Sequence, residues 1–107
     1  MDKHPIDKSA PDYTAFKATL SAEQPPPGLP ELLRALWLDA KGNSDAAHRI
    51  AQDVDTPDGA RVHAYLHRKE GDLSNARYWY RTAGVAAESG SLSAEWEALL
   101  RHFLKQK

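Results

Sequence analysis

The strongest constraint on the fold of this chain is the stretch from Arg61 to Gly84, which predicts two helices joined by a tight reversal. The sequence at the reversal is Glu70-Gly71-Asp72-Leu73. Glycine is suited to the left-handed position just past a helix, and a polar residue can begin the next helix directly after it. The stretch therefore predicts an antiparallel helical hairpin.

The length and composition indicate one soluble domain. The chain has 107 residues, of which 41% are apolar and 27% are charged, and it contains no cysteine. Disulfides, thiolate zinc sites and cysteine nucleophiles are therefore excluded. The first twelve residues lack the apolar core of a secretory signal, and no apolar run is long enough to cross a bilayer. We expect a cytoplasmic protein with no membrane partner.

The charge is distributed unevenly along the chain. Residues 1–60 carry six Lys/Arg and ten Asp/Glu, whereas residues 61–81 carry five and two. The central hairpin thus has a modest basic patch, with a local charge of 5 − 2 = +3. A nucleic-acid-binding domain would present a broader basic face, so no nucleic-acid partner is expected.

The pattern predicts an all-α fold of about six helices, arranged as antiparallel hairpins or a compact bundle. Residues 1–8 are expected to be a flexible N-terminus, and residues 9–107 to form a single helical domain. Its predicted parts are a first helix (9–24), a proline-rich connector (25–29), two helical hairpins (30–87, the last helix running 73–87) and a C-terminal helix (91–105). Strands are not expected, because alternating apolar patterns are absent. Ser44, Thr56 and Ser91 are the predicted N-caps of the helices that follow them.

The two hairpins are related by an internal repeat. When Gly42 is aligned with Gly71, small residues recur at equal distances on both sides: Ala35 with Ala64 before the glycines, and Ala47 with Ala76 after them. Helices cross closely where small side chains face each other, so these alanines are predicted at the crossings.

The second copy, from Ala64 through Gly71-Asp72 and Ala76 to Tyr80 and Ala83, resembles the tetratricopeptide repeat and its Sel-type variant. The resemblance covers residues 57–87 and, less closely, residues 29–56. It implies a stack of helical hairpins capped by the flanking helices. The 29-residue spacing is shorter than the usual period of about 34, and histidines occupy positions 63 and 67, where leucine and tyrosine are usual.

A first candidate site is a binding face on the helix before Gly71. Arg61, Tyr65 and Arg68 fall at i, i+4 and i+7, and Lys69 follows them. The family resemblance implies that this helix lines a concave groove. Guanidinium groups beside a phenol suit a carboxylate, a phosphate or an acidic peptide. The alternative is a solvated charged face without a partner.

A second candidate site is a metal-binding cluster. His63, His67 and Glu70 fall within about 60° of one another on a helix, and His48 on the preceding helix could supply a fourth ligand. Such a set could hold zinc, nickel or a similar divalent ion. The alternative is that the histidines are packing residues that hydrogen-bond within the protein.

The aromatic run Tyr78-Trp79-Tyr80 spans too much of a helix to face one core. Tyr80 is predicted to be buried, and Tyr78 or Trp79 to pack against the last helix near Trp96. Trp37 and Trp96 are expected to be core anchors. A further possibility is that the aromatic helix and the last helix mediate self-association.

The sequence contains no glycine-rich phosphate loop, no nucleophile elbow and no metalloprotease motif. We therefore expect a non-catalytic helical-repeat module that recognises a protein or acidic peptide. The alternative is a metal- or small-ligand-binding domain that uses the histidine cluster. No cofactor is expected apart from the possible divalent metal.

Overall fold

The computed structural model describes residues 9–106 and is all-helical over that range, as predicted. The expected flexible segment 1–8 and the last residue, Lys107, lie outside the described residues. The elements are α1 (Ser9–Ala18), the 3-10 turn η2 (Thr19–Ser21), α2 (Glu31–Ala40), α3 (Ser44–Asp53), α4 (Pro57–Lys69), α5 (Leu73–Ala83) and α6 (Leu92–Lys105). Among these residues there is no strand and no helix long and apolar enough to cross a membrane.

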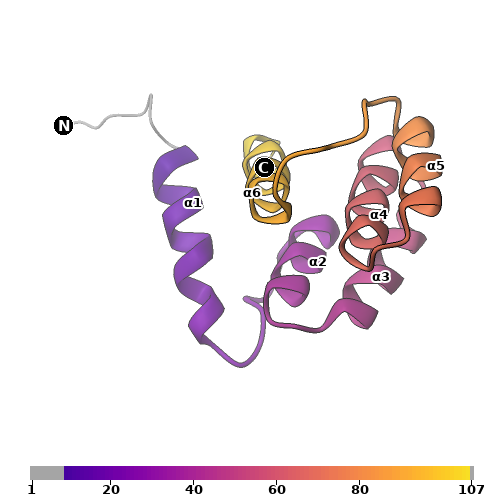
Figure 1. The fold of residues 1–107 in the computed structure, drawn as a ribbon. Helices are drawn as coiled ribbons and strands as arrows, with labels where there is room; N and C mark the ends of the chain where they lie inside the picture. The colour runs from indigo at the N-terminus through magenta and orange to yellow at the C-terminus, as the bar shows by residue number, and fades with distance from the viewer. Residues whose placement is uncertain (1–8, 107) are drawn as a thin grey trace.

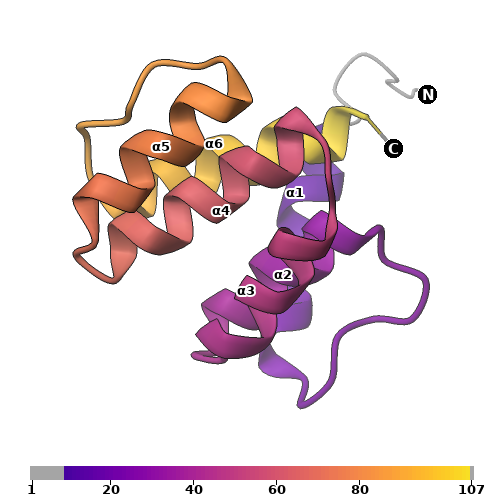
Figure 2. The same cartoon turned by 90° about the vertical axis from the view of Figure 1, so that its right-hand side faces the viewer.

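The helices form two antiparallel pairs, α2 with α3 and α4 with α5, and α3 packs against α4 between the pairs (Figure 2). The last helix, α6, does not extend this series. It packs against α1, α2 and α4, and Figure 1 shows it end-on between α1 and the second pair. The long segment after α5 brings the chain across to this position.

Most predicted helix starts are confirmed, and one is corrected. The side chains of Thr56 and Ser91 accept hydrogen bonds from the third backbone N–H beyond them, as N-caps do. For α3 the cap is Asn43 and not Ser44, since the Asn43 side chain accepts from Ala46 N at 3.2 Å. Asparagine is as good an N-cap as serine, so composition alone could not choose between neighbours.

Two predicted helix ends were too late. The first helix is α-helical only to Ala18 and closes in the 3-10 turn η2, before the proline-rich connector. The fifth helix ends at Ala83 and does not continue to residue 87. Gly84 adopts φ +77°, and Val85 N donates back to Tyr80 O, which is the usual hydrogen bond of a glycine-terminated helix.

The main core lies where α6 meets α2 and α4. Its largest fully buried side chains are Trp37, Leu33, Leu36, Leu66, Leu99, Leu100 and Val62. Both predicted tryptophan anchors are present: Trp37 Nε1 donates to Thr19 Oγ1, and Trp96 Nε1 donates to Leu36 O, each at 3.0 Å. The indoles therefore tie α2 to η2 and to α6 while filling the core.

The alanines of the internal repeat are all buried, namely Ala35, Ala47, Ala64 and Ala76. Ala64 and Ala76 pack together with Tyr80 between α4 and α5. A further close approach was not predicted. A Cβ atom at Gly59, in the first turn of α4, would lie only 1.9 Å from the backbone oxygen of Val54. The α3–α4 connection therefore requires glycine at this position.

Substituting Gly59→Ala is expected to lower the free energy of unfolding by about 2–3 kcal/mol, because the added methyl group meets backbone and the connection must shift. Urea unfolding measures this loss. Gly90→Ala is the matched control, since a Cβ there meets nothing within 4 Å, and its effect should stay within about 0.5 kcal/mol. Equal stability of the two variants would contradict the proposed clash.

Candidate functional site

The predicted binding face on α4 is occupied by contacts within the protein. Tyr65 is only 3% exposed, and its hydroxyl donates to Asp39 Oδ2 at 2.8 Å. Lys69 Nζ donates to the other oxygen of the same carboxylate, also at 2.8 Å. Asp39 lies on α2 and is 2% exposed, so its charge is removed from water and balanced by Lys69.

A second buried carboxylate contacts Arg68, in the same turn of α4. Glu95, on α6, is 4% exposed. Its Oε1 accepts from Arg68 Nη1 at 2.8 Å, and its Oε2 accepts from the Tyr80 hydroxyl at 2.6 Å. Arg68 also donates to the backbone oxygen of Gly90, in the segment that leads into α6.

These contacts correct the sequence-based interpretation of Arg61, Tyr65, Arg68 and Lys69. The prediction was that these groups would bind the carboxylates of a partner, and in the structure Tyr65, Arg68 and Lys69 contact carboxylates. The carboxylates, however, belong to α2 and α6 of the same chain. Arg61 is half-buried and takes part in neither network. The four residues therefore do not form a free face for an acidic partner.

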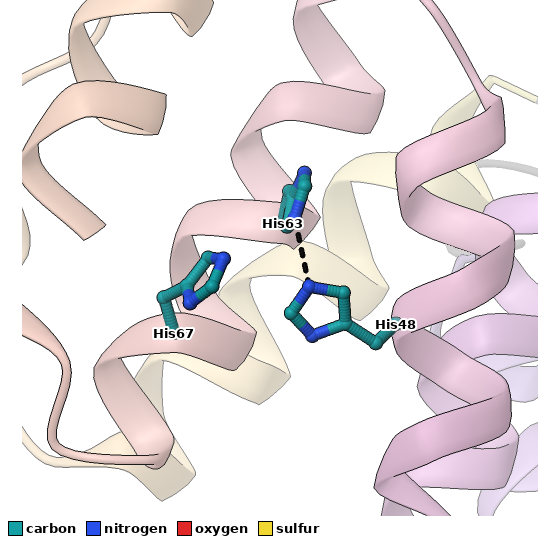
Figure 3. A group of neighbouring side chains, drawn as sticks. All are labelled: His48, His63 and His67. Atoms are coloured by element: carbon teal, nitrogen blue, oxygen red, sulfur yellow. Dashed lines mark hydrogen bonds between the residues drawn. The ribbon is translucent and has the colours of Figure 1, made fainter. Parts of the chain in front are cut away.

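The histidine cluster, in contrast, is assembled. His48 lies on α3, and His63 and His67 lie one turn apart on α4, with the three rings gathered around a common space (Figure 3). The Nε2 atoms of His48 and His63 are 2.8 Å apart and share a hydrogen bond. One nitrogen from each ring can be chosen so that all three lie within 4.8 Å of one another.

Local packing fixes these imidazoles. The ring of His63 stacks on the indole of Trp79, with centroids 4.1 Å apart, and His63 is 5% exposed. Tyr78 or Trp79 was predicted to pack against the last helix, but Trp79 packs against the histidine cluster and Tyr78 is exposed. The rings of His48 and His67 meet edge to face at 4.7 Å. The side chains of these two residues are mostly buried.

The environment keeps His63 neutral. Burial, with a smaller contribution from repulsion by His48 and His67, lowers the pKa of His63 from its usual 6.5 to about 4. A neutral imidazole has a free nitrogen lone pair at physiological pH. The ring is therefore in the form that binds a metal.

Glu70 lies beside the cluster. Its Oε2 is 3.5 Å from His48 Nδ1, and its Oε1 is 3.4 Å from His67 Nδ1. Asp72 Oδ2 is 3.7 Å from the same His67 nitrogen. Although these carboxylates are near, the buried His67 Nδ1 lacks an aligned hydrogen bond. A buried polar atom without a partner requires an explanation.

Sequence reasoning did not identify Asp39, Glu95 or Trp79 as functional neighbours. A signal was present for Asp39, which follows the apolar run Leu36-Trp37-Leu38, but not for Glu95, which lies between Ser93 and Glu97 in a mixed segment. Acidic residues are rarely buried without a charged partner. The partners, Lys69 and Arg68, lie 30 and 27 residues away and cannot be assigned from local spacing.

Comparison of the chain with models of protein families, with curated proteins and with solved structures finds no match.

Raising the pH above 10 is expected to destabilise the protein through Tyr65 and Tyr80. Burial, followed by hydrogen bonds to Asp39 and Glu95, raises the pKa of both phenols well above 10. The unfolded chain then releases protons that the folded chain retains. This stabilisation is therefore complete below pH 10 and falls as the pH rises further, by at most about 1.4 kcal/mol per pH unit for each phenol.

Urea unfolding at successive pH values from 8 to 11 measures this slope. The variant Tyr65→Phe/Tyr80→Phe should be less stable at pH 8, because it removes hydrogen bonds to buried carboxylates, but its stability should fall less steeply above pH 10. Tyr78→Phe is the control for loss of an exposed phenol. An unchanged slope in the double variant would contradict the prediction.

Proposed function

We propose that the protein binds a divalent transition-metal ion through His48, His63 and His67. The observation that carries the proposal is the convergence of three imidazoles from two helices, with one nitrogen of each within 4.8 Å of the others. Imidazole nitrogen is a preferred ligand for zinc, copper and nickel. No cysteine is needed for such a site, and the chain has none.

The His48–His63 pair fits a metal after a small adjustment, whereas the widest separation in the cluster, up to 4.8 Å, would have to shorten by about 1.4 Å. Zinc–nitrogen bonds of 2.0–2.1 Å in tetrahedral geometry place two ligand nitrogens about 3.3–3.4 Å apart. The Nε2 atoms of His48 and His63 lie 2.8 Å apart, held by a shared hydrogen bond. They would separate by about 0.5 Å when an ion replaces the shared proton.

The packing interpretation of the histidines explains less of the cluster. A hydrogen bond uses one nitrogen of His48 and one of His63, but it leaves His67 Nδ1 buried and without an aligned partner. Three apolar side chains would fill the same space without this cost. A bound ion would instead use one nitrogen of each ring, including His67, which the His48–His63 hydrogen bond leaves out.

The tetratricopeptide-like resemblance stays a prediction, which the two helical hairpins support. Partner recognition or self-association by another surface also stays a prediction. The face predicted to bind an acidic peptide gives it no support, because Tyr65, Arg68 and Lys69 are engaged within the protein. Metal binding is therefore the function that the side-chain geometry favours.

Addition of Zn²⁺, Ni²⁺ or Co²⁺ to chelator-treated protein is expected to raise its thermal stability in a saturable way. An ion that binds only the folded state at 100 times its Kd stabilises that state by about 2.7 kcal/mol. For a domain of this size the melting temperature would rise by on the order of 10 °C. Calorimetric titration of the same protein should give one ion per chain.

The double variant His63→Gln/His67→Gln should lose this response. His102→Gln is the matched control, because His102 on α6 interacts with Asp58 at 3.1 Å and lies outside the cluster. The control should retain the wild-type response to metal. If no metal stabilises the wild-type protein, or if the double variant responds as the wild type does, the proposal is wrong.

A further inference from the structure

Resting on the proposed metal site, we infer that Glu70 is not a metal ligand but a positioning residue that holds the imidazoles of His48 and His67 through their Nδ1 atoms. The ion would then have three protein ligands, all Nε2 atoms. Its fourth position would be open to water or to a small anion. The sequence had placed Glu70 among the ligands.

His48 is oriented with one ring nitrogen toward His63 and the other toward Glu70. Its Nε2 faces His63 Nε2 at 2.8 Å, on the inner side of the cluster. Its Nδ1 lies 3.5 Å from Glu70 Oε2. The two ring nitrogens of an imidazole direct their lone pairs away from each other, so one ion cannot be bound by Nε2 and lie close to the group that contacts Nδ1. Glu70 is therefore on the outer side of His48.

His67 approaches the same carboxylate through its Nδ1 atom. Its Nδ1 lies 3.4 Å from the other oxygen of the same carboxylate but is not yet aligned with it; once a hydrogen bond forms there, Nε2 is the nitrogen left for the ion. One carboxylate thus approaches the outer nitrogens of two rings, with one oxygen for each. In metal sites the second ring N–H of a histidine ligand commonly donates to such a carboxylate, which fixes the tautomer and the ring orientation.

Two nearby features show how this arrangement is held. Asp72 also approaches His67 Nδ1, at 3.7 Å, and is itself fixed as the N-cap of α5 by Asn75 N and by the Asn75 side chain at 2.7 Å. Glu70 is the C-cap residue of α4, and its side chain is 48% exposed. The carboxylate can therefore align with both imidazoles when the rings rotate to bind an ion.

The consequence is an open coordination position. Three nitrogen ligands and a water molecule are the ligand set of zinc sites that accept an exogenous ligand, whereas closed structural sites use four protein ligands. With neutral imidazoles only, the bound ion would keep its positive charge. A small anion such as azide or a carboxylate is therefore the class of ligand expected at the fourth position.

The test is a Co²⁺ titration followed by visible absorption, because the position and intensity of the cobalt bands report the atoms bound to the ion. Wild-type protein is compared with Glu70→Gln, Glu70→Ala and the charge-matched control Glu31→Gln, whose carboxylate pairs with Arg34 on α2 at 3.9 Å. Circular dichroism checks the fold of each variant.

We expect both Glu70 variants to bind Co²⁺ about 10–100-fold more weakly than the wild type, with unchanged bands. The control should match the wild type in affinity, and azide should shift the bands of the wild-type complex. Altered bands in a Glu70 variant, unchanged affinity in both variants, or bands insensitive to azide would overturn the inference. Absence of cobalt bands in the wild type would refute the metal site itself, so the two failures are distinguishable.

Discussion

The close approach of α4 to the helices on both of its sides is the constraint on which the rest of the structure depends. Ala64 and Ala76 are buried at the contact with α5, and Gly59 lies directly against the backbone of Val54 where α3 turns into α4. Larger residues at these positions would force the helices apart. The same approach places His48 beside His63, so the geometry of the histidine cluster is set by residues that have no polar chemistry.

Two buried carboxylates, on α2 and α6, pair with the side of α4 that faces those helices. Burial of a charge is unfavourable unless the charge is paired and hydrogen-bonded. Asp39 meets this requirement with Tyr65 and Lys69, and Glu95 meets it with Arg68 and Tyr80. Loss of one partner would leave an uncompensated charge, so these pairs favour one placement of α2 and α6 over others. The face that would line a groove in a helical-repeat protein is thereby filled by α6.

Local patterns in the sequence predicted the helices, the glycine reversals and the side-by-side placement of His63 and His67, because each depends on residues within a few positions of one another. They failed at the N-cap of α3, where Asn43 and Ser44 are equally good caps. They also failed at Gly84, which ends α5 although the prediction continued the helix past it. They also failed at Asp39 and Glu95, since pairing with Lys69 and Arg68 depends on how distant helices pack. His48 could be named as a candidate, but only the α3–α4 contact decides which of its nitrogens faces His63.

The position of the cluster gives a bound ion a structural effect as well as a chemical one. His48 belongs to the hairpin of α2 and α3, whereas His63 and His67 belong to the hairpin of α4 and α5. An ion held by all three would link the two hairpins at their contact, close to the turn that contains Glu70. Because the rings converge from elements already fixed by Gly59 and the alanines, little ordering free energy would be required on binding. Stability and ligand binding would then depend on the same packing, and a substitution that separates α3 from α4 would weaken both.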